Sequence, residues 1–175
     1  MEPVVLRTRR LTLRPLGPGD LTAVHAYASD PENTRYMLRL PNGTLAETRA
    51  FLEAAGAEWA KEQPGFYEFA VLLEGTLIGA VSLYLQEGGR EAELGWILNK
   101  RCWGLGLATE AAGELVRFAR ERLRLRRLVA HCDTENEGSR RVMEKLGMAR
   151  IGEFGGRYSR QFPEERREYL YELAL

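Results

Sequence analysis

A glycine-rich turn between a strand and a helix constrains this fold more than any other segment. Residues 91–98 are predicted to form a strand, about 107–122 a helix and 128–133 a second strand. The turn Arg101-Cys-Trp-Gly-Leu-Gly-Leu-Ala108 joins the first strand to the helix. A strand, a crossover helix and a strand in this order favour two parallel strands in one sheet.

The same turn is suited to binding phosphate. Glycines allow a tight turn that brings main-chain N–H groups close to a ligand, and a helix start adds unpaired donors and partial positive charge. The turn lacks the Gly-Lys-Ser/Thr of a P-loop and the three spaced glycines of a dinucleotide-binding fold. A turn with a purely structural role remains the alternative.

The other segments predict a mixed α/β domain. Thr44-Leu-Ala-Glu47 is a capping box that opens a helix, and Glu74-Gly75 is a two-residue hairpin turn between two strands. Asn136 and Gly147 bound a short helix. The remaining predicted elements are a strand at 11–16, a helix from Pro18 to about Tyr27, strands at 67–73 and 76–85, and strands at about 149–154 and 167–173.

Length and composition favour one soluble domain over residues 1–175. The chain carries 25 basic and 25 acidic side chains, and this zero net charge argues against general nucleic-acid binding. No apolar stretch is long enough to span a membrane, and the N-terminus lacks a secretory signal. Two cysteines are too few for a disulfide framework, so a reducing cytoplasm is expected. The strong preference for Arg and Glu fits either a GC-rich genome or a hot habitat.

Two motifs resemble the GNAT acetyltransferase superfamily. The segment from Glu93 through Arg101-x-x-Gly-x-Gly-x-Ala-Thr-Glu110 is similar to its acetyl-CoA-binding motif, and Asn136-x-x-Ser139 through Lys145-Leu-Gly-Met148 is similar to its second signature. The opening Thr8-x-Arg-Leu-x-Leu-Arg-Pro-Leu, with Asp20, Asp30-Pro31 and Thr34-Arg35-Tyr36, resembles the RimJ/RimL branch of ribosomal-protein N-acetyltransferases. The resemblance runs from about residue 6 to residue 173.

The resemblance implies a fold and a cofactor site. It implies one GNAT-like domain with a splayed sheet of six to seven strands flanked by helices, binding acetyl-CoA as co-substrate without a metal. A main-chain N–H near Ile97 or Leu98 would polarise the thioester oxygen. Asn136 would contact the cofactor or cap its helix, and the two roles are compatible. The remaining cofactor-binding residues implied are Arg101, Trp103, Gly104, Leu105, Gly106, Leu107 and Ala108.

Two residues are candidates for catalysis. Many relatives use a Tyr as the acid where this chain has Met143, so Ser139, a turn earlier, is the candidate acid; its alternative role is to satisfy the helix backbone. Glu93 is the candidate base because strand parity directs it to the acceptor side; the alternative is a solvated or arginine-paired carboxylate. A weak base suits a protein α-amine, with a pKa of about 7.8, better than lysine at about 10.4.

The resulting hypothesis is acetyl transfer to a protein or peptide N-terminus by direct attack on the thioester. A small-molecule amine acetyltransferase and a non-catalytic acyl-CoA sensor are the alternatives, and either a monomer or a homodimer is compatible. Structural roles are expected for His25, for His131 and for a core Cys132, and Cys102 is expected to contribute backbone to the loop. The arginine-rich run 117–127 is interpreted as a solvated helix face, with a phosphate or acidic partner as its alternative.

Overall fold

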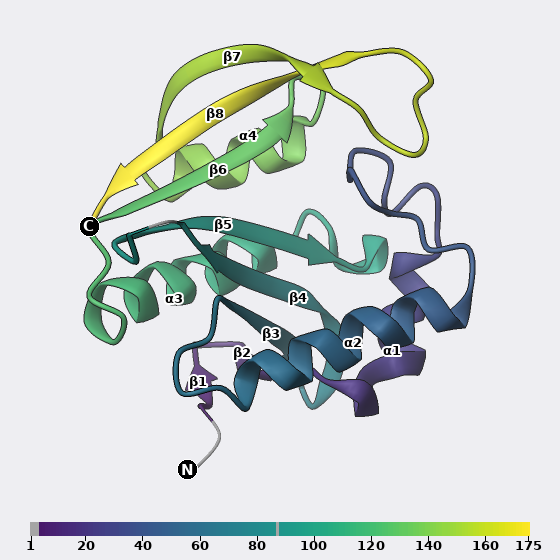
Figure 1. Cartoon of the computed structure of the whole chain (residues 1–175), viewed down its shortest axis with the longest axis vertical. Helices are drawn as coiled ribbons and strands as arrows, with labels where there is room; N and C mark the ends of the chain where they lie inside the picture. The colour runs from purple at the N-terminus through teal and green to yellow at the C-terminus, as the bar shows by residue number, and fades with distance from the viewer. Residues whose placement is uncertain (1–3, 87) are drawn as a thin grey trace.

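The computed structural model describes residues 4–86 and 88–175, whose strands form one eight-stranded sheet (Figure 1). The strands are ordered β1-β2-β3-β4-β5-β6-β8-β7, and only β5 and β6 are parallel neighbours. They are β1 Leu6–Arg7, β2 Leu11–Pro15, β3 Phe66–Leu73, β4 Thr76–Leu85, β5 Glu91–Leu98, β6 Arg127–Asp133, β7 Ala149–Arg157 and β8 Arg166–Ala174. The helices are α1 Leu21–Ala28, α2 Leu45–Trp59, α3 Leu107–Glu121 and α4 Glu137–Lys145, with 3-10 turns η1 Pro18–Asp20 and η2 Lys100–Cys102.

The predicted α/β class and mixed sheet are confirmed, but the sheet has one strand more than the six or seven expected. The addition is β1, which pairs Leu6 with Leu13 and Arg7 with Thr12 of β2. Two residues are too short to show a period-two pattern, so this strand exists only through its partner. The predicted domain begins at residue 1, and the expected lack of a secretory signal draws on Met1–Pro3. Those three residues and Glu87 lie outside the described residues.

Local signals explain most element boundaries. Thr44 accepts from the Glu47 N–H at the start of α2, while the Glu47 carboxylate accepts from the Thr44 N–H, as a capping box requires. Glu74 and Gly75 have φ angles of 50° and 81°, the left-handed conformation that a tight hairpin between β3 and β4 needs. These sequence-based predictions are therefore confirmed.

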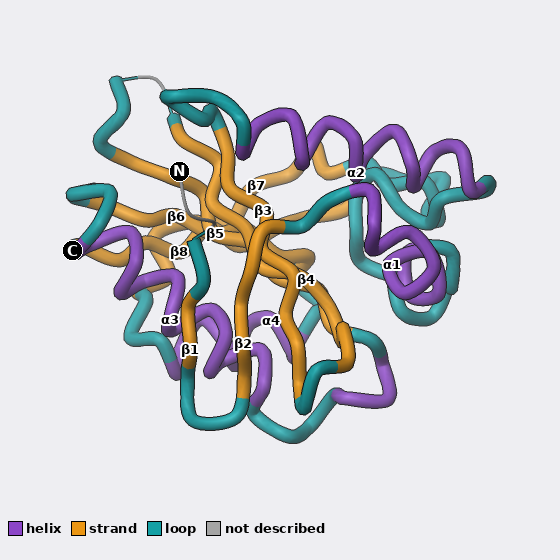
Figure 2. Tube along the Cα trace, turned by 90° about the horizontal axis from the view of Figure 1, so that it is seen from below, coloured by secondary structure: helices purple, strands orange, loops and turns teal. Residues whose placement is uncertain are grey.

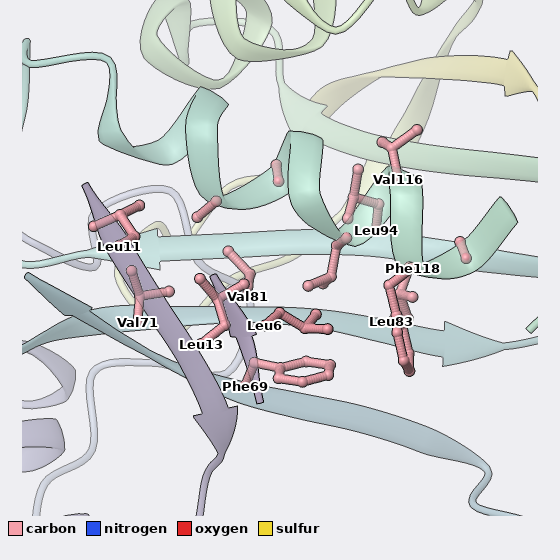
Figure 3. Close-up of a cluster of buried hydrophobic side chains, with 14 of the residues drawn as sticks. Leu6, Leu11, Leu13, Phe69, Val71, Val81, Leu83, Leu94, Val116 and Phe118 are labelled. Carbon is pink, nitrogen blue, oxygen red and sulfur yellow. The ribbon is translucent and has the colours of Figure 1, made fainter. Parts of the chain in front are cut away.

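The helices cover opposite faces of the sheet (Figure 2). Helices α1 and α2 pack on one face, through a cluster that includes Leu16, Leu52, Ala70 and Ala80. Helix α3 packs on the other face, over the larger cluster drawn in Figure 3. Because side chains alternate along a strand, even-numbered residues of β3 and odd-numbered residues of β5 lie on the α1–α2 face. The two faces of the sheet therefore carry different sets of side chains.

The sheet opens between β5 and β6. These strands pair over only three residues, from Glu91↔Arg127 to Glu93↔Val129. Beyond that point β5 continues beside β4 to Leu98, and β6 continues beside β8 to Asp133, so the two strands diverge (Figure 1). We call this opening the fork. Strands β5 and β6, with α3 as the crossover helix between them, form the parallel β-α-β unit predicted from the sequence.

Candidate functional site

The glycine-rich turn presents a continuous row of free donors. Gly104 and Gly106 have φ angles of 76° and 74°, a left-handed conformation that other residues adopt at a cost. In the part of the chain that the structure describes, the main-chain N–H groups of residues 104–109 donate no hydrogen bond. The last three of these lie in the first turn of α3, at the positive end of its dipole. A row of free donors of this kind at a helix start is suited to binding an anion such as phosphate.

Side chains from the opposite end of the chain hold this turn in place. The Arg10 guanidinium donates to the Leu105 carbonyl at 2.9 Å and to the Glu110 carboxylate at 2.6 Å. The Thr8 hydroxyl donates to the same carboxylate at 2.6 Å. These bonds to Thr8 and Arg10 hold the pKa of Glu110 below its usual range, although partial burial acts in the opposite direction. The motif residue Glu110 therefore supports the loop from behind.

A cavity of about 590 Å³ runs from this turn to the far side of the fork. Its walls come from the end of β5, the glycine-rich turn, the start of α4 and the loop between α1 and α2. The predicted cofactor residues that line it are Ile97, Leu98, Trp103, Gly104, Gly106, Leu107, Ala108 and Asn136. Arg101 and Leu105 are not among the lining residues, and the Leu105 side chain is exposed.

Main-chain directions distinguish the two candidate oxyanion donors. The Glu91 carbonyl and the Asn99 N–H both hydrogen-bond on the β4 side, so odd-numbered residues of β5 point their main-chain groups toward β4. The Arg90 carbonyl bonds instead to the residue preceding β6, so even-numbered residues point toward β6. Leu98 N–H therefore points into the fork, whereas Ile97 N–H points away from it. The sequence alone did not distinguish Ile97 from Leu98 as the oxyanion donor.

The start of α4 brings Asn136 and Ser139 to the cavity. The Asn136 carboxamide oxygen accepts from the Ser139 N–H at 3.1 Å, so the predicted N-cap is confirmed. Among the described residues, the Ser139 hydroxyl has no hydrogen-bond partner, and it lines the cavity. Met143 is fully buried in a cluster with Ala130 and Cys132, so its side chain contributes to the core and not to the site.

The loop between α1 and α2 contacts the end of β7 and the loop that follows it. Arg157 of β7 donates to the Tyr36 carbonyl at 2.8 Å, and Gln161 donates to the Thr34 hydroxyl at 3.1 Å. The loop between β7 and β8 thus leans on the loop between α1 and α2, as the upper right of Figure 1 shows. The second of these loops also lines the cavity.

Polar side chains gather on the α1–α2 face beside the fork. They come from four adjacent strands: Glu68 of β3, Ser82 and Tyr84 of β4, Glu93 of β5 and His131 of β6. The Tyr84 hydroxyl donates to Glu68 at 2.6 Å, and His131 Nδ1 lies 3.0 Å from Glu93 Oε1. The sequence favoured a structural role for His131 because it lies inside a strand with no neighbouring metal ligands, and its partner Glu93 is 38 residues away. The sequence offered one signal for this contact: the alternation of side chains along β5 and β6, which can place Glu93 and His131 on the same face of the sheet.

Burial and pairing shift the pKa values of this cluster. Burial raises the pKa of Glu68 to about 7, against the smaller opposing effect of the Tyr84 hydrogen bond. The hydrogen bond to Glu93 raises the pKa of His131 above its ordinary value, although burial acts in the opposite direction. A carboxyl group and an imidazole whose pKa values are shifted by burial and by a specific partner are typical of functional sites.

Of His25, the two cysteines and the arginine-rich run, only Cys102 lines the cavity. His25 Nδ1 is 2.8 Å from the Thr48 hydroxyl, which joins α1 to α2. Cys132 is buried and Cys102 lines the cavity, both as free thiols. At the two ends of the arginine-rich run, Arg117 pairs with Glu114 and Glu121, and Arg127 pairs with acids of β5 and β8.

Two further features are not found in the described ranges 4–86 and 88–175. No three His, Cys, Asp or Glu side chains gather there as a metal site. No helix in those ranges is long and apolar enough to cross a membrane.

Comparison with known proteins agrees with this geometry. Residues 10–149 match the Acetyltransferase (GNAT) domain family. The uncharacterized N-acetyltransferase YnaD of Bacillus subtilis is 33% identical over 85% of both chains. The putative ribosomal N-acetyltransferase YdaF of the same organism is 30% identical over 67% of this chain and 65% of its own. The crystal structure of a GNAT-family acetyltransferase from Bacillus anthracis is 31% identical, covers 98% of both chains and superposes with a TM-score of 0.82.

Proposed function

The chain belongs to the GNAT acetyltransferase family, and we propose that it acetylates the α-amine at the N-terminus of a protein or peptide, using acetyl-CoA. The coarser activity, N-acetyl transfer, is that of the family. The finer assignment concerns the acceptor. It agrees with the resemblance of the opening motifs to the RimJ/RimL branch and with the ribosomal acceptor in the name of YdaF.

The row of free N–H groups at residues 104–109 is the observation that carries the proposal. Six consecutive donors at a helix start fit the pyrophosphate of CoA. The cavity continues from these donors past Leu98 to the opposite face of the sheet. A long, thin co-substrate with an anionic end and a reactive end is the ligand that such a channel fits.

Three groups of the chain would act at the reacting end. Leu98 N–H would stabilise the thioester oxygen as negative charge develops on it. The Ser139 hydroxyl, which lines the cavity without a protein partner, would give a proton to the departing thiolate. Asn136 would keep the start of α4 in position through its bond to the Ser139 N–H. The proposed reaction has no covalent intermediate with a protein side chain.

The acceptor class follows from proton chemistry. An α-amine with a pKa of about 7.8 is appreciably neutral at physiological pH, whereas lysine at about 10.4 costs about 3.5 kcal/mol more to deprotonate. Burial raises the pKa of Glu68 to about 7, and the hydrogen bond to Glu93 raises the pKa of His131 above its ordinary value. Groups of this kind suit an α-amine better than the more basic amine of lysine.

A small-molecule amine is the second candidate, and two hydrogen bonds favour it. The loop between β7 and β8 bonds to the loop between α1 and α2, which narrows the approach to the fork. In either case we propose that one domain over residues 1–175 carries the activity. We place it in the cytoplasm, where Cys102 and Cys132 would stay reduced.

A panel of acceptors tests the proposal. Thiol release from acetyl-CoA is measured with free N-terminal peptides, with the same peptides blocked at the N-terminus but carrying a lysine, and with small amines such as spermidine. We expect release with the free N-terminal peptides alone. Release with small amines alone would move the assignment to the second candidate. CoA binding without release for any amine would show a sensor instead of an enzyme.

A further inference from the structure

Where the sheet opens, an imidazole and a carboxylate face each other. Glu93 belongs to the last residue pair that joins β5 to β6, and His131 lies two residues further along β6, past the end of the pairing. The distance from His131 Nδ1 to Glu93 Oε1 is 3.0 Å. The sequence separates the two residues by 38 positions, and the parallel strands bring them together.

This pair lies on the acceptor side of the sheet. Glu93 shares its face of β5 with Ile97, which packs against the cluster beneath α1 and α2. The opposite face of the sheet carries α3, whose first turn presents the free N–H groups for the phosphates. A co-substrate bound to those groups and reaching through the fork meets an acceptor that comes from the side of Glu93 and His131.

The imidazole lies at the edge of the fork, although neither His131 nor Glu93 is among the residues that line the cavity. Beyond the last pair of the ladder, β5 continues away from β6 through Gly95, which has no side chain. A Cβ at Gly95 would lie 2.8 Å from the Ser82 hydroxyl oxygen, so a larger residue there would displace that hydroxyl. The ring of His131 is also partly open, with 30% of its side chain exposed.

Hydrogen bonding determines which ring nitrogen can accept a proton. A carboxylate at Nδ1 favours the tautomer with hydrogen on Nδ1, which leaves the lone pair on Nε2. Among residues 4–86 and 88–175, no group hydrogen-bonds to Nε2. We propose that His131 is the catalytic residue that takes the proton from the acceptor amine, and that Glu93 is a positioning residue that holds its ring. This inference rests on the proposed acetyltransferase function and reassigns the base that the sequence placed at Glu93.

The protons and bonds balance without another reactant. Nε2 of His131 accepts one proton from the ammonium, and the neutral amine attacks the acetyl carbon. The N–C bond forms and the C–S bond breaks, with the electron pair leaving on sulfur. The nitrogen then loses its second proton, the thiolate gains one, and His131 returns its own to solvent. One net proton is released for each amide formed.

Neighbouring charges adjust the basicity of the ring. The Glu93 hydrogen bond raises the pKa of His131, and Glu168 of β8 adds to the increase, whereas burial and Arg157 of β7 lower it. Tyr84 of β4 lies opposite Glu93 in the register and completes the surroundings. A base with a pKa above that of ordinary histidine is well matched to an α-amine of about 7.8.

The pH dependence of kcat/KM tests the base. The comparison uses the parent, His131→Gln, Glu93→Gln and, as a control, His25→Gln, whose side chain contacts Thr48 away from the fork. We expect His131→Gln to lose the acid limb of the profile and about 100-fold or more in rate. Glu93→Gln should keep the limb but move it to lower pH. His25→Gln should retain the parent profile.

A second measurement does not depend on turnover. The chain has two histidines, so NMR titration of the imidazoles, assigned with His25→Gln, gives the pKa of His131 directly. We expect a value above 6.5 that falls in Glu93→Gln, with CoA affinity unchanged in His131→Gln. An active parent with an unchanged acid limb and rate in His131→Gln would overturn the base assignment alone. A parent inactive with every amine would overturn the proposed function and this inference with it.

Discussion

The side-chain amide of Asn33 donates to the Leu98 carbonyl at 2.9 Å, across 65 residues of sequence. Its oxygen accepts from the Lys100 N–H at 2.6 Å. Asn33 is almost completely buried, so one side chain fastens the loop between α1 and α2 to the end of β5. This end of β5 carries the N–H that points into the fork. Asn33 thus links the loop between α1 and α2 to the strand end that carries the proposed oxyanion donor, the Leu98 N–H.

Replacing Asn33 should damage both stability and the site. Asn33→Ala leaves the Lys100 N–H without its buried partner, which should lower the free energy of unfolding by about 2 kcal/mol. It should also weaken CoA binding, because Leu98 loses a support. Urea unfolding and calorimetric titration with CoA measure the two effects. The control is Glu32→Gln, which removes only an exposed ion pair with Lys100 and should leave both quantities unchanged.

Aspartate at Gly104 should abolish cofactor binding. The new carboxylate would stand in the row of N–H donors and repel phosphate, so the Kd for CoA should rise about 100-fold, or ~3 kcal/mol. Gly75→Asp is the matched control. Both glycines have left-handed φ angles, 76° and 81°, and open space where a Cβ would stand. Equal loss of CoA affinity in both variants would contradict the placement of the phosphate site.

Removing the Ser139 hydroxyl should slow the chemical step without affecting binding. Ser139→Ala keeps the main-chain N–H that Asn136 caps, so helix α4 should stay folded. We expect kcat to fall about tenfold and the Kd for CoA to stay within about twofold. Ser29→Ala, which deletes a hydroxyl bonded to the His25 carbonyl and not among the residues that line the cavity, provides the comparison. A turnover within a factor of two of the parent would exclude an important acid role.

Buried Glu68 should make stability depend on pH. Its pKa is raised from 4.5 to about 7 in the folded chain, so the folded state binds the proton more tightly than the unfolded state. Stability should therefore decline as pH rises from about 4.5 to about 7, by on the order of 3 kcal/mol. Glu68→Gln should flatten this part of the curve in unfolding experiments from pH 4 to 8.

The phenol beside Glu68 provides a companion test. Tyr84→Phe removes the hydrogen bond that lowers the pKa of Glu68, so the decline in stability should extend to higher pH. The same denaturation series at each pH measures it. A curve that overlays the parent would show that the hydroxyl does not act on the carboxyl group.

Most of the fold was predictable because its signals are local. The capping box at Thr44 and the Glu74-Gly75 turn each involve residues close together in the chain, so they constrain the backbone before any tertiary contact forms. The strand–glycine–helix–strand order spans residues 91–133 and is predictable because parallel neighbours require a crossover connection. Strand β1 was missed because two residues carry no pattern, and it exists only beside β2.

The sequence by itself determined the glycine-rich turn where we propose that phosphate binds, since Gly104, Gly106 and the helix start belong to one short segment. Only the tertiary structure decided the acceptor end. The pairing of Glu93 with His131, the anchoring of Leu98 by Asn33 and the direction of the Leu98 N–H all depend on how strands register across the sheet. Register is fixed by the packing of both faces of the sheet, which no short segment contains.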